Sequence, residues 1–487
     1  MSPPSTSDAT LRPQLPSGLV AFVKRDCPTC ELVAPVLAQI AGQTQLHVYT
    51  QDDPDFPKGI DARDDTSLEL SWHHDIEVVP TLLRVVEGME KERLLGWQRD
   101  EWEAFTGVSA LGPELPEWRP GCGSLSVDPS READLRARYG GGVLRSRRVE
   151  IAELEDEMEA PFARGWTDGL PVVPPTEKRV LSMLQGTTRA PDEVVATVPP
   201  DLAACSVEKV AINAVMAGCT PEHLPVVLAA VEAACTDAFN IHGVLATTMG
   251  VGPVIVVNGP IRQGIGMNAG MNVLGQGNRA NLATGRALQL VIRNVGGGRP
   301  GEVDRATFGN PGKLGLCFAE DEEGSPWGPL SADLGAEAGA NTVTLFAGEG
   351  ARTIVDQLSR DPESLARSYA ANLRTLHHPK LLMAFDCMLA IGPEHARVFA
   401  EAGWSKAKLK ERLHELLLIS GEEVVRGAGG IAEGLPEGVR SATLPKFRPG
   451  GILIVHCGGG AGLFSAMIGG WLNGEAGSQP VVREIVG

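Results

Sequence analysis

The first hundred residues alternate short apolar runs with polar segments. Apolar runs at residues 19–23, 46–50 and 80–87 predict buried strands, and the spacing of apolar positions over residues 29–41 predicts an amphipathic helix. A second helix is expected near residues 100–105. The order strand, helix, strand, strand, helix predicts a small α/β unit.

Beyond its first third, the chain changes character. Helices are expected at residues 207–217 and 221–234, and three apolar runs, at residues 253–257, 381–391 and 452–455, each end in a glycine turn. Continuous apolar runs that alternate with helices are typical of strands buried on both faces of a parallel sheet. We therefore expect a large, multi-layer α/β domain with a mostly parallel sheet, in which the three glycine turns lie at equivalent strand ends.

The predicted organisation has four parts. They are a flexible N-terminus at residues 1–15, a small α/β unit at residues 16–108, a linker at residues 109–147, and a large catalytic α/β domain at residues 148–487 with room for two subdomains. The linker is predicted because Pro, Gly, Ser and Arg dominate there without any helical or strand periodicity.

Composition narrows the classes of partner. The 487 residues carry 43 Lys and Arg against 61 Asp and Glu, a formal charge of −18, which repels nucleic-acid phosphates and anionic membranes. No apolar stretch is long enough to span a membrane and no signal-peptide pattern opens the chain, so we expect a cytoplasmic protein. Nine cysteines, an odd number, argue against a secreted disulfide framework and favour reduced thiols.

Two cysteines stand where redox chemistry is favoured. Cys27-Pro28-Thr29-Cys30 follows a predicted strand and opens a predicted helix, where unpaired N–H groups and the helix dipole stabilise a thiolate on Cys27. Cys30, inside the first turn, is close enough to resolve a mixed disulfide. Half of a zinc site is the alternative, but no second cysteine or histidine pair has the matching spacing, so no metal is predicted.

These residues resemble the thioredoxin family. Pro35 stands five residues after Cys30, where thioredoxins carry a helix-kinking proline, and Val79-Pro80-Thr81 matches the cis-proline loop of that family. Gly88 and Gly96 fall where the family makes its later turns. The resemblance covers roughly residues 16–108.

The resemblance implies a thioredoxin-like domain and a role for three residues. Cys27 would be the attacking thiol, Cys30 the resolving thiol, and Pro80 the cis residue that shapes the groove for a partner's backbone. The sequence departs from the family pattern in three places. Asp26 stands in place of a tryptophan, Pro28-Thr29 in place of Gly-Pro, and Ala21 in place of a buried aspartate.

Further catalytic candidates lie outside the small unit. Cys457 follows His456 at the end of a predicted strand and begins a glycine run, a turn in which sulfur can be exposed among backbone N–H donors. Cys122 follows the small unit directly and can exchange with Cys27, although an exposed bystander thiol is the alternative. We therefore take Cys457, His456 and Cys122 as catalytic candidates.

Two irregular segments are candidates for substrate binding. The first, at residues 165–171, contains Trp166 and Asp168 and is either a binding loop or a proline-fixed connector. The second follows the predicted strand at residues 253–257, and its glycines, beside a helix N-terminus, suit a carboxylate or a phosphate. Its candidate residues are Asn258, Arg262, Asn268 and Arg279. Tight turns between buried elements are the alternative interpretation of this loop.

The large region also resembles a group of bacterial proteins of little-known function. They share the opening Gly165-Trp166-Thr167-Asp168-Gly169-Leu170-Pro171, and some relatives are linked to selenocysteine-containing reductases with a Sec-Gly-Ser-Cys motif. Cys122-Gly123-Ser124-Leu125 matches that motif in part, with Leu125 where the second thiol would stand. The resemblance implies thiol chemistry.

Together these features predict a thiol-dependent oxidoreductase. The dithiol unit would supply electrons to, or exchange sulfur with, a cysteine site in the large domain that acts on a small anionic metabolite. The redox-active cysteine pair is the only cofactor-like group expected. A thiol reductant or a thioredoxin reductase is the expected partner, and the question of a homo-oligomer stays open.

Two other functions remain alternatives. One is a cysteine-dependent lyase or sulfur-transfer enzyme that acts on a carbon–heteroatom or soft-metal bond, which would turn over without consuming two electrons. The other is a redox-regulated binding or chaperone protein, whose large domain would bind a ligand and turn over no metabolite.

Overall fold

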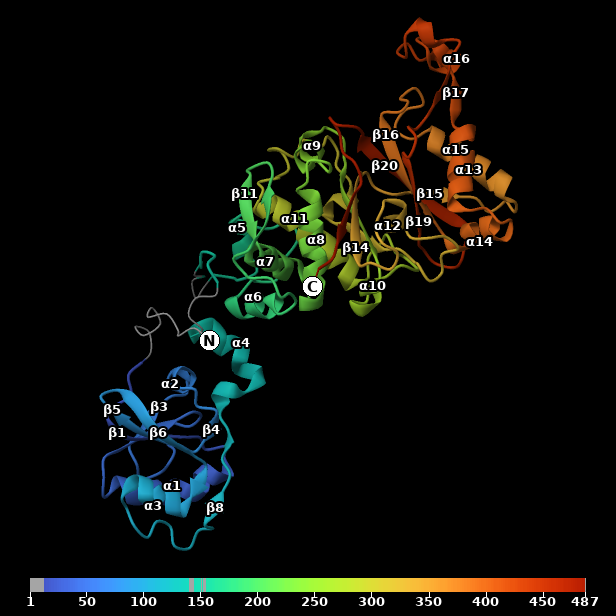
Figure 1. The fold of residues 1–487 in the computed structure, drawn as a ribbon. Helices are drawn as coiled ribbons and strands as arrows, with labels where there is room; N and C mark the ends of the chain where they lie inside the picture. Colours follow the sequence, from blue (N-terminus) through green and yellow to red (C-terminus); the bar gives the residue numbers. More distant parts are fainter. Residues whose placement is uncertain (1–12, 140–143, 150, 152–154, 487) are drawn as a thin grey trace. The chain divides into compact units, whose positions relative to one another are not determined.

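The computed structural model describes residues 13–139, 144–149, 151 and 155–486, and the chain divides into two compact units between Val143 and Leu144 (Figure 1). Residues 1–12 of the predicted N-terminus and residues 140–143 of the predicted linker lie outside the described residues. Leu15, within that predicted N-terminus, is buried in the core of the smaller unit. Helices and mixed sheets confirm the general α/β class.

The smaller unit is built on a five-stranded sheet with the strand order β3-β2-β1-β5-β6. The strands are β1 Gly18–Val23, β2 Leu46–Thr50, β3 Ala62–Asp64, β5 Thr81–Val86 and β6 Met89–Leu95, and the helices are α1 Pro28–Ala41, α2 Glu69–His73 and α3 Arg99–Thr106. β1 runs parallel to β2 and antiparallel to β5. Trp97 and Trp102 meet edge to face with ring centroids 5.2 Å apart inside the core, which fixes α3 against the sheet.

Part of the segment predicted as a linker belongs to the smaller unit. It forms β8 Trp118–Arg119, β9 Cys122–Gly123, the short 3-10 helix η2 Leu125–Val127 and α4 Pro129–Tyr139. β8 pairs antiparallel with β7 Trp97–Gln98, and β9 pairs antiparallel with β4 Val78–Val79. The chain therefore returns along the body of the smaller unit before it reaches the larger one.

The larger unit contains an eight-stranded sheet whose main path is β13-β12-β14-β20-β16-β19. The strands are β12 Gly252–Asn258, β13 Leu316–Ala319, β14 Thr342–Gly348, β15 Arg352–Val355, β16 Phe385–Ile391, β19 Ile452–His456, β20 Phe464–Leu472 and β21 Val481–Glu484. Parallel pairing joins β12 to β13 and β16 to β19, and the five other pairings of this sheet are antiparallel. The prediction of a mostly parallel sheet is therefore wrong.

Both faces of this sheet are buried, which explains the wrong prediction. Alternate residues such as Ile255 and Leu389 face the covering helices. The residues between them, such as Val254, Met388 and Leu453, form one cluster with contributions from all six strands of the main path. The Asp321 N–H, just after β13, donates to the His456 carbonyl at the end of β19 at 2.9 Å, so the two end strands meet and the sheet curls around this cluster. A curled antiparallel sheet under helices thus produces the continuous apolar runs that are typical of parallel strands.

Helices cover the outer face of the curled sheet in two groups. The first consists of α7 Val207–Ala217, α8 Leu224–Ala234 and α11 Arg279–Asn294, and the second of α13 Pro362–Arg374, α14 Pro393–Glu401 and α15 Lys406–Leu416. Figure 1 shows the first group in green to yellow-green and the second in orange.

Shorter elements complete the larger unit. They are α5 Ala160–Ala163, α6 Glu177–Leu184, β10 Val194–Val198, β11 Ala203–Ser206, α9 Ile241–Ala246, α10 Ile261–Gly264, α12 Leu330–Asp333, β17 Leu418–Ser420, α16 Gly421–Val424 and β18 Thr443–Pro445. Within the described part of the chain, no helix is long and apolar enough to cross a membrane.

The sheet of the larger unit has a two-fold topology. β12, β13 and β14 are paired in the same way as β16, β19 and β20, and β14 and β20 meet at Gly348 and Gly470. β15, which follows β14, pairs with β20, whereas β21, which follows β20, pairs with β14. Each half therefore gives one strand to the other. The sequence shows no fixed-period repeat because the connections between equivalent strands differ in length.

Candidate functional site

Cys27 caps the N-terminus of α1. Its backbone is extended (φ −149°, ψ 110°), and its Sγ accepts the backbone N–H of Cys30 at 3.2 Å. Pro28, the first helical residue, has no N–H to satisfy and favours the helical φ. The sulfur of Cys27 is therefore held against the positive end of a 14-residue helix.

The two thiols of the pair differ in ionisation. Hydrogen bonding from the Cys30 thiol, helped by the Cys122 thiol and by the backbone N–H groups of Cys30 and Thr29, lowers the pKa of Cys27 to about 5 against the opposing effect of burial. Burial, followed by the neighbouring Cys27, raises the pKa of Cys30 far above its ordinary value. At neutral pH Cys27 is a thiolate and Cys30 a thiol, as a nucleophile and a resolving group require.

Cys122 is the third sulfur at this site. Strand pairing places it opposite Val79, whose carbonyl oxygen lies 3.6 Å from the Cys27 Sγ, so the Cys122 thiol is a neighbour of Cys27. Burial and then the neighbouring Cys27 raise the pKa of Cys122, so it stands beside the thiolate as a proton-bearing thiol. The structure thus brings together Cys27, Cys30 and Cys122, which we call the thiol cluster.

The chain around Cys122 covers Cys27. The Thr29 hydroxyl donates to the Pro120 carbonyl at 2.7 Å, and the Lys24 ammonium donates to the Gly123 carbonyl at 2.8 Å. Cys27 is only 1% exposed as a result. The Val79–Pro80 peptide is cis, and the Cys27 Sγ lies 3.6 Å from the Val79 carbonyl oxygen. Pro80 therefore lies next to the thiol cluster.

Cys457 lies in the larger unit, at the end of β19. It is 4% exposed, and burial, then the charges of Glu320 and Asp321, raise the pKa of its thiol far above the ordinary value. Cys457 is on the wall of a cleft of about 670 Å³. The expected exposed sulfur is thus a buried, neutral thiol at the inner face of the curled sheet.

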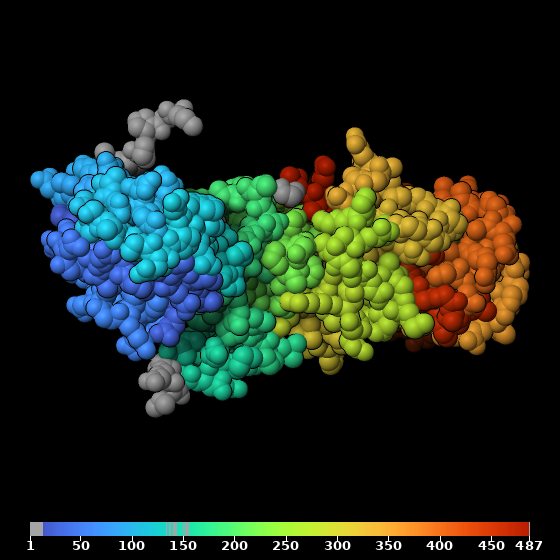
Figure 2. Space-filling view, turned by 90° about the horizontal axis from the view of Figure 1, so that it is seen from below, coloured from blue at the N-terminus to red at the C-terminus, as the bar shows by residue number. Residues whose placement is uncertain are grey.

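The cleft is lined mainly by glycine-rich loops and by small side chains. Its wall is formed by residues 272–275, 311–312, 316, 350–351, 353, 390, 392, 457–459, 461 and 464–466. Figure 2 shows red atoms of the C-terminal part of the chain against yellow-green atoms of its middle part. The Gly458 N–H donates to the Ala269 carbonyl at 2.8 Å, which joins two such segments. The lining contains no Lys, Arg, Asp or Glu, so donors to a ligand come from the backbone and from the side chains of Asn272 and Thr353.

Ser465 has a defined hydrogen-bonding role. Its Oγ lies 2.9 Å from Nδ1 of His395 and 2.8 Å from the hydroxyl of Tyr369. The other ring nitrogen of His395, Nε2, donates to the Asp356 carbonyl at 3.0 Å, so the neutral ring accepts the Ser465 proton at Nδ1. His395 and Tyr369 are fully buried on the helix-covered face. The network therefore fixes α13 and α14 to β20.

His456, Asn258 and Arg262 meet at Glu320. The Glu320 carboxylate accepts the Asn258 side-chain amide at 2.8 Å and the His456 backbone N–H at 3.3 Å, while the Arg262 guanidinium donates to the Glu320 carbonyl at 2.7 Å. Burial raises the pKa of Glu320. Since Glu320 follows β13 and His456 ends β19, these four residues, here called the Glu320 cluster, join the two end strands of the sheet.

The proton on His456 has a fixed place. Its Nδ1 donates to the Asp321 carbonyl at 3.0 Å, and its Nε2 has no hydrogen-bond partner among the described residues although the ring is buried. His456 is not among the residues that line the cleft.

The remaining substrate-binding candidates lie apart from the cleft. Asp168 pairs with Arg286 at 2.7 Å, and the Trp166 carbonyl accepts the Asn294 side-chain amide at 3.0 Å. The Asn268 amide donates to the Met271 carbonyl at 2.9 Å, and the Arg279 guanidinium donates to the Gly218 carbonyl at 2.7 Å. Asn258 and Arg262 belong to the Glu320 cluster, where Arg262 is already paired with Glu322 and Glu323. None of the six candidates is among the residues that line the cleft.

Sequence reasoning missed the residues that hold Cys122 in place. Lys24 and Thr29 have no pattern of their own, and the signal that could have pointed to a close approach of two backbones is Gly121, directly before Cys122. Among the described residues, no group of three or more His, Cys, Asp or Glu side chains is arranged to hold a metal ion. Comparisons with protein-family models, with curated proteins and with solved structures gave no match to this chain.

Proposed function

We propose that this chain is a thiol–disulfide oxidoreductase that uses Cys27 and Cys30. The observation that carries the proposal is the placement of the two thiols: the Cys27 Sγ caps α1 and accepts the Cys30 N–H at 3.2 Å, and Cys30 is buried in the first turn. This placement lowers the pKa of Cys27 to about 5, while burial raises that of Cys30. Such a pair has a nucleophile that is already deprotonated and a second thiol held within one helical turn.

The reaction takes place in two exchanges. The Cys27 thiolate attacks one sulfur of a substrate disulfide, whose other sulfur leaves as a thiolate. Cys30 then loses its proton and attacks the Cys27 sulfur, which releases the second substrate thiol and leaves a Cys27–Cys30 disulfide. Two electrons pass to the substrate, and an external thiol reductant or a thioredoxin reductase returns them.

The thioredoxin resemblance supports this function. The strand order β3-β2-β1-β5-β6, α1 opening at the dithiol and the Val79–Pro80 loop beside it agree with what the resemblance implies for residues 16–108. In this proposal Pro80 shapes the groove that receives a partner's backbone.

The larger unit is proposed to carry the site for a small anionic metabolite. A cleft of about 670 Å³ has the size of a small-molecule site, and its wall includes residues 457–459 and 461 of a glycine-rich loop, a type of loop that binds anions through its backbone. Cys457 on its wall would exchange electrons or sulfur with the dithiol. The neutral state of Cys457 favours a second candidate function, a redox-regulated binding protein whose cleft holds the metabolite without turnover.

The dithiol is tested by single-equivalent oxidation of the reduced full-length chain with hydroxyethyl disulfide, followed by non-reducing peptide mapping. We expect a Cys27–Cys30 disulfide in the native chain, no such product in Cys27→Ser, and a trapped Cys27 adduct or cross-link in Cys30→Ser. Cys235→Ser, at the end of α8, is the matched control and should behave as the native chain. An oxidation rate in Cys27→Ser equal to that of the native chain would contradict the proposal.

The role of Cys457 is tested by looking for its disulfide. In the double variant Cys30→Ser, Cys122→Ser, which can neither complete the second exchange nor join Cys27 to Cys122, oxidation should accumulate a Cys27–Cys457 cross-link if electrons pass to the cleft. A further substitution, Cys457→Ser, should remove that product. If the cross-link never forms and the native chain turns over no metabolite, the binding function replaces the reductase function.

A further inference from the structure

Residues 118–124 lie along the smaller unit in the manner of a bound peptide. Trp118 and Arg119 pair with Gln98 and Trp97, and Cys122 and Gly123 pair with Val79 and Val78, all antiparallel. The Ser124 N–H then donates to the Glu77 carbonyl at 2.9 Å. Addition of an extended segment to a strand edge is a common mode of peptide recognition, with the backbone providing affinity and single side chains providing specificity.

Close packing shows that this segment fits its groove. A Cβ on Gly121 would lie 2.3 Å from Cγ1 of Val78 and 2.9 Å from the Val79 carbonyl oxygen. A Cβ on Gly96 would lie 2.8 Å from the Gly121 nitrogen. Two glycines thus allow the backbones to touch, and the contact aligns Cys122 with Cys27.

Polar side chains bind the backbone on both sides of Cys122 in the groove. Thr29 and Lys24 donate to the carbonyls of Pro120 and Gly123, as described above. On the far side, the Gln51 amide donates to Ser124 Oγ at 2.7 Å and its carbonyl accepts the Leu125 N–H at 3.0 Å. Gln51 is itself buried, so these bonds are shielded from water.

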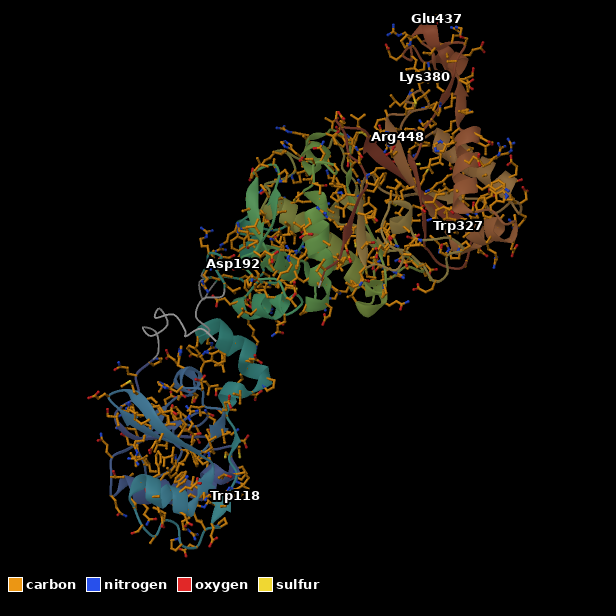
Figure 3. The ribbon with its side chains drawn as sticks, viewed as in Figure 1. Trp118, Asp192, Trp327, Lys380, Glu437 and Arg448 are labelled. Atoms are coloured by element: carbon orange, nitrogen blue, oxygen red, sulfur yellow. The ribbon has the colours of Figure 1, made fainter. Side chains whose placement is uncertain are left out.

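The segment leaves Cys122 as the accessible thiol of the cluster. Cys27 is 1% exposed and Cys30 is fully buried, whereas Cys122 is partly exposed. An external disulfide can therefore reach Cys122 more readily than Cys27 while the segment is in place. Figure 3 labels Trp118, whose largely exposed side chain marks where the segment enters.

We infer that Cys122 is the built-in substrate thiol of Cys27: it accepts oxidation from a low-molecular-weight disulfide and passes it to the Cys27–Cys30 pair. This inference rests on the proposed function. It makes Cys122 a catalytic residue that reacts first, and it makes residues 118–124 the peptide that the groove recognises.

The steps balance as three exchanges. Cys122 loses its proton to water and attacks a disulfide R–S–S–R, forming Cys122–S–S–R and releasing RS⁻, which takes up a proton from water. The Cys27 thiolate attacks the Cys122 sulfur and displaces the second RS⁻, which also takes a proton from water, forming Cys27–Cys122. Cys30 attacks the Cys27 sulfur, and its proton passes to the leaving sulfur of Cys122, which restores the Cys122 thiol and leaves Cys27–Cys30. The net change is one disulfide reduced to two RSH and the Cys27–Cys30 pair oxidised, with one proton taken from water because Cys27 begins as a thiolate.

The first test uses the full-length chain and hydroxyethyl disulfide. In Cys30→Ser, which blocks the third exchange, peptide mapping should find Cys27–Cys122 as the main cross-link. In Cys122→Ser, formation of Cys27–Cys30 should slow at least tenfold. An unchanged or faster rate in Cys122→Ser, or no Cys27–Cys122 cross-link in Cys30→Ser, would overturn the inference.

A pair of glycine variants tests the groove without touching a thiol. Gly121→Ala places a methyl group against Val78 and should displace the segment, so that Cys27–Cys122 yield in a Cys30→Ser background falls at least fivefold and alkylation of Cys27 by iodoacetamide rises. Gly123→Ala is the matched control, because its Cβ would have no atom within 4 Å. Equal cross-link yields in the two variants would count against the inference.

The two proposals fail in different ways. If Cys27→Ser oxidises as the native chain does, the dithiol function itself fails. If Cys27 and Cys30 remain essential while loss of Cys122 costs nothing, the dithiol function stands and only the role of Cys122 is overturned.

Discussion

At the scale of single residues, Cys27 and Cys30 show how position alone sets the chemistry of a side chain. Both are cysteines buried in one core, yet one is the N-cap of a helix and the other lies inside its first turn. Hydrogen-bond donors around Cys27 lower the pKa of its thiol, whereas burial is the main cause that raises the pKa of the Cys30 thiol. Three residues of chain thus separate a thiolate from a thiol.

The ionisation of Cys27 gives a prediction for pH. A titration of reduced protein followed by ultraviolet thiolate absorbance should show a step with its midpoint at about pH 5. Cys27→Ser should lose this step, and Cys235→Ser should keep it. A step near the ordinary cysteine pKa, about 8.5, would mean that the N-cap and the neighbouring thiols do not stabilise the thiolate.

The same shift predicts how stability depends on pH. Because the pKa of Cys27 is lower in the folded state than in the unfolded chain, its contribution is fully present above about pH 8.5 and is lost as the pH falls through about 5. The free energy of unfolding of the reduced smaller unit should therefore rise between these values. Denaturant melts of the native chain and of Cys27→Ser measure the difference, and parallel curves would contradict the prediction.

Residue patterns predicted part of the site. The helix opening at Cys27 and the thiols Cys30 and Cys122 were all identified, because the chemistry of a helix N-terminus is local. The pairing of Cys122 with Val79 was not, since it joins strands of two residues that are distant in sequence. Cys457 was expected to have an exposed sulfur, and the curl of the sheet instead puts its strand end inside.

At the scale of elements, the end strands of the larger sheet are joined through a single buried carboxylate. Glu320 accepts N–H groups from Asn258, from Leu330 at 2.7 Å and from His456. Removal of this acceptor leaves three donors buried without a partner, and each lost partner is costly away from water.

This arrangement predicts a large effect of one substitution. Glu320→Ala should lower the free energy of unfolding of the larger unit by about 3 kcal/mol, because buried donors lose their acceptor. Glu411→Ala, on the exposed face of α15, should change it by less than about 0.5 kcal/mol. Urea denaturation measures both, and a small effect of Glu320→Ala would mean that the end strands are held together in another way.

The positions of the helices and strands were predicted better than the pairing of the strands. Residues 29–41 were expected as a helix and α1 spans Pro28–Ala41, and residues 253–257 lie inside β12. Pairing direction was wrong because periodicity reports how many faces of a strand are buried and not which neighbour it has. β16 shows this directly, with an apolar run that pairs parallel on one side and antiparallel on the other.

At the scale of the whole molecule, each unit has its own hydrophobic core. The smaller unit packs around residues that include Trp102, and the larger unit packs on both faces of its curled sheet, with Phe399 in one of these clusters. A unit with its own core can unfold as one cooperative body.

Calorimetry should therefore resolve two transitions. Trp102→Ala should lower the midpoint of one of them, at a cost of about 3–5 kcal/mol, and Phe399→Ala should lower the other by a similar amount. Each variant is the control for the other. A single transition that both substitutions shift together would contradict independent unfolding.

The exchanged strands of the larger unit bear on its ancestry. A chain that carried only β12 to β15 would leave β15 without the strand it needs and β14 without β21. Two copies about one axis would complete each other, so the unit has the plan of an intertwined homodimer joined into one polypeptide. In a homodimer both copies must have the same sequence, whereas the two halves of one polypeptide can carry different residues at equivalent positions. Glu320 and Asp321 follow β13 at the place where His456 and Cys457 stand at the end of β19. Of the two halves, only the second therefore contributes a thiol to the lining of the cleft.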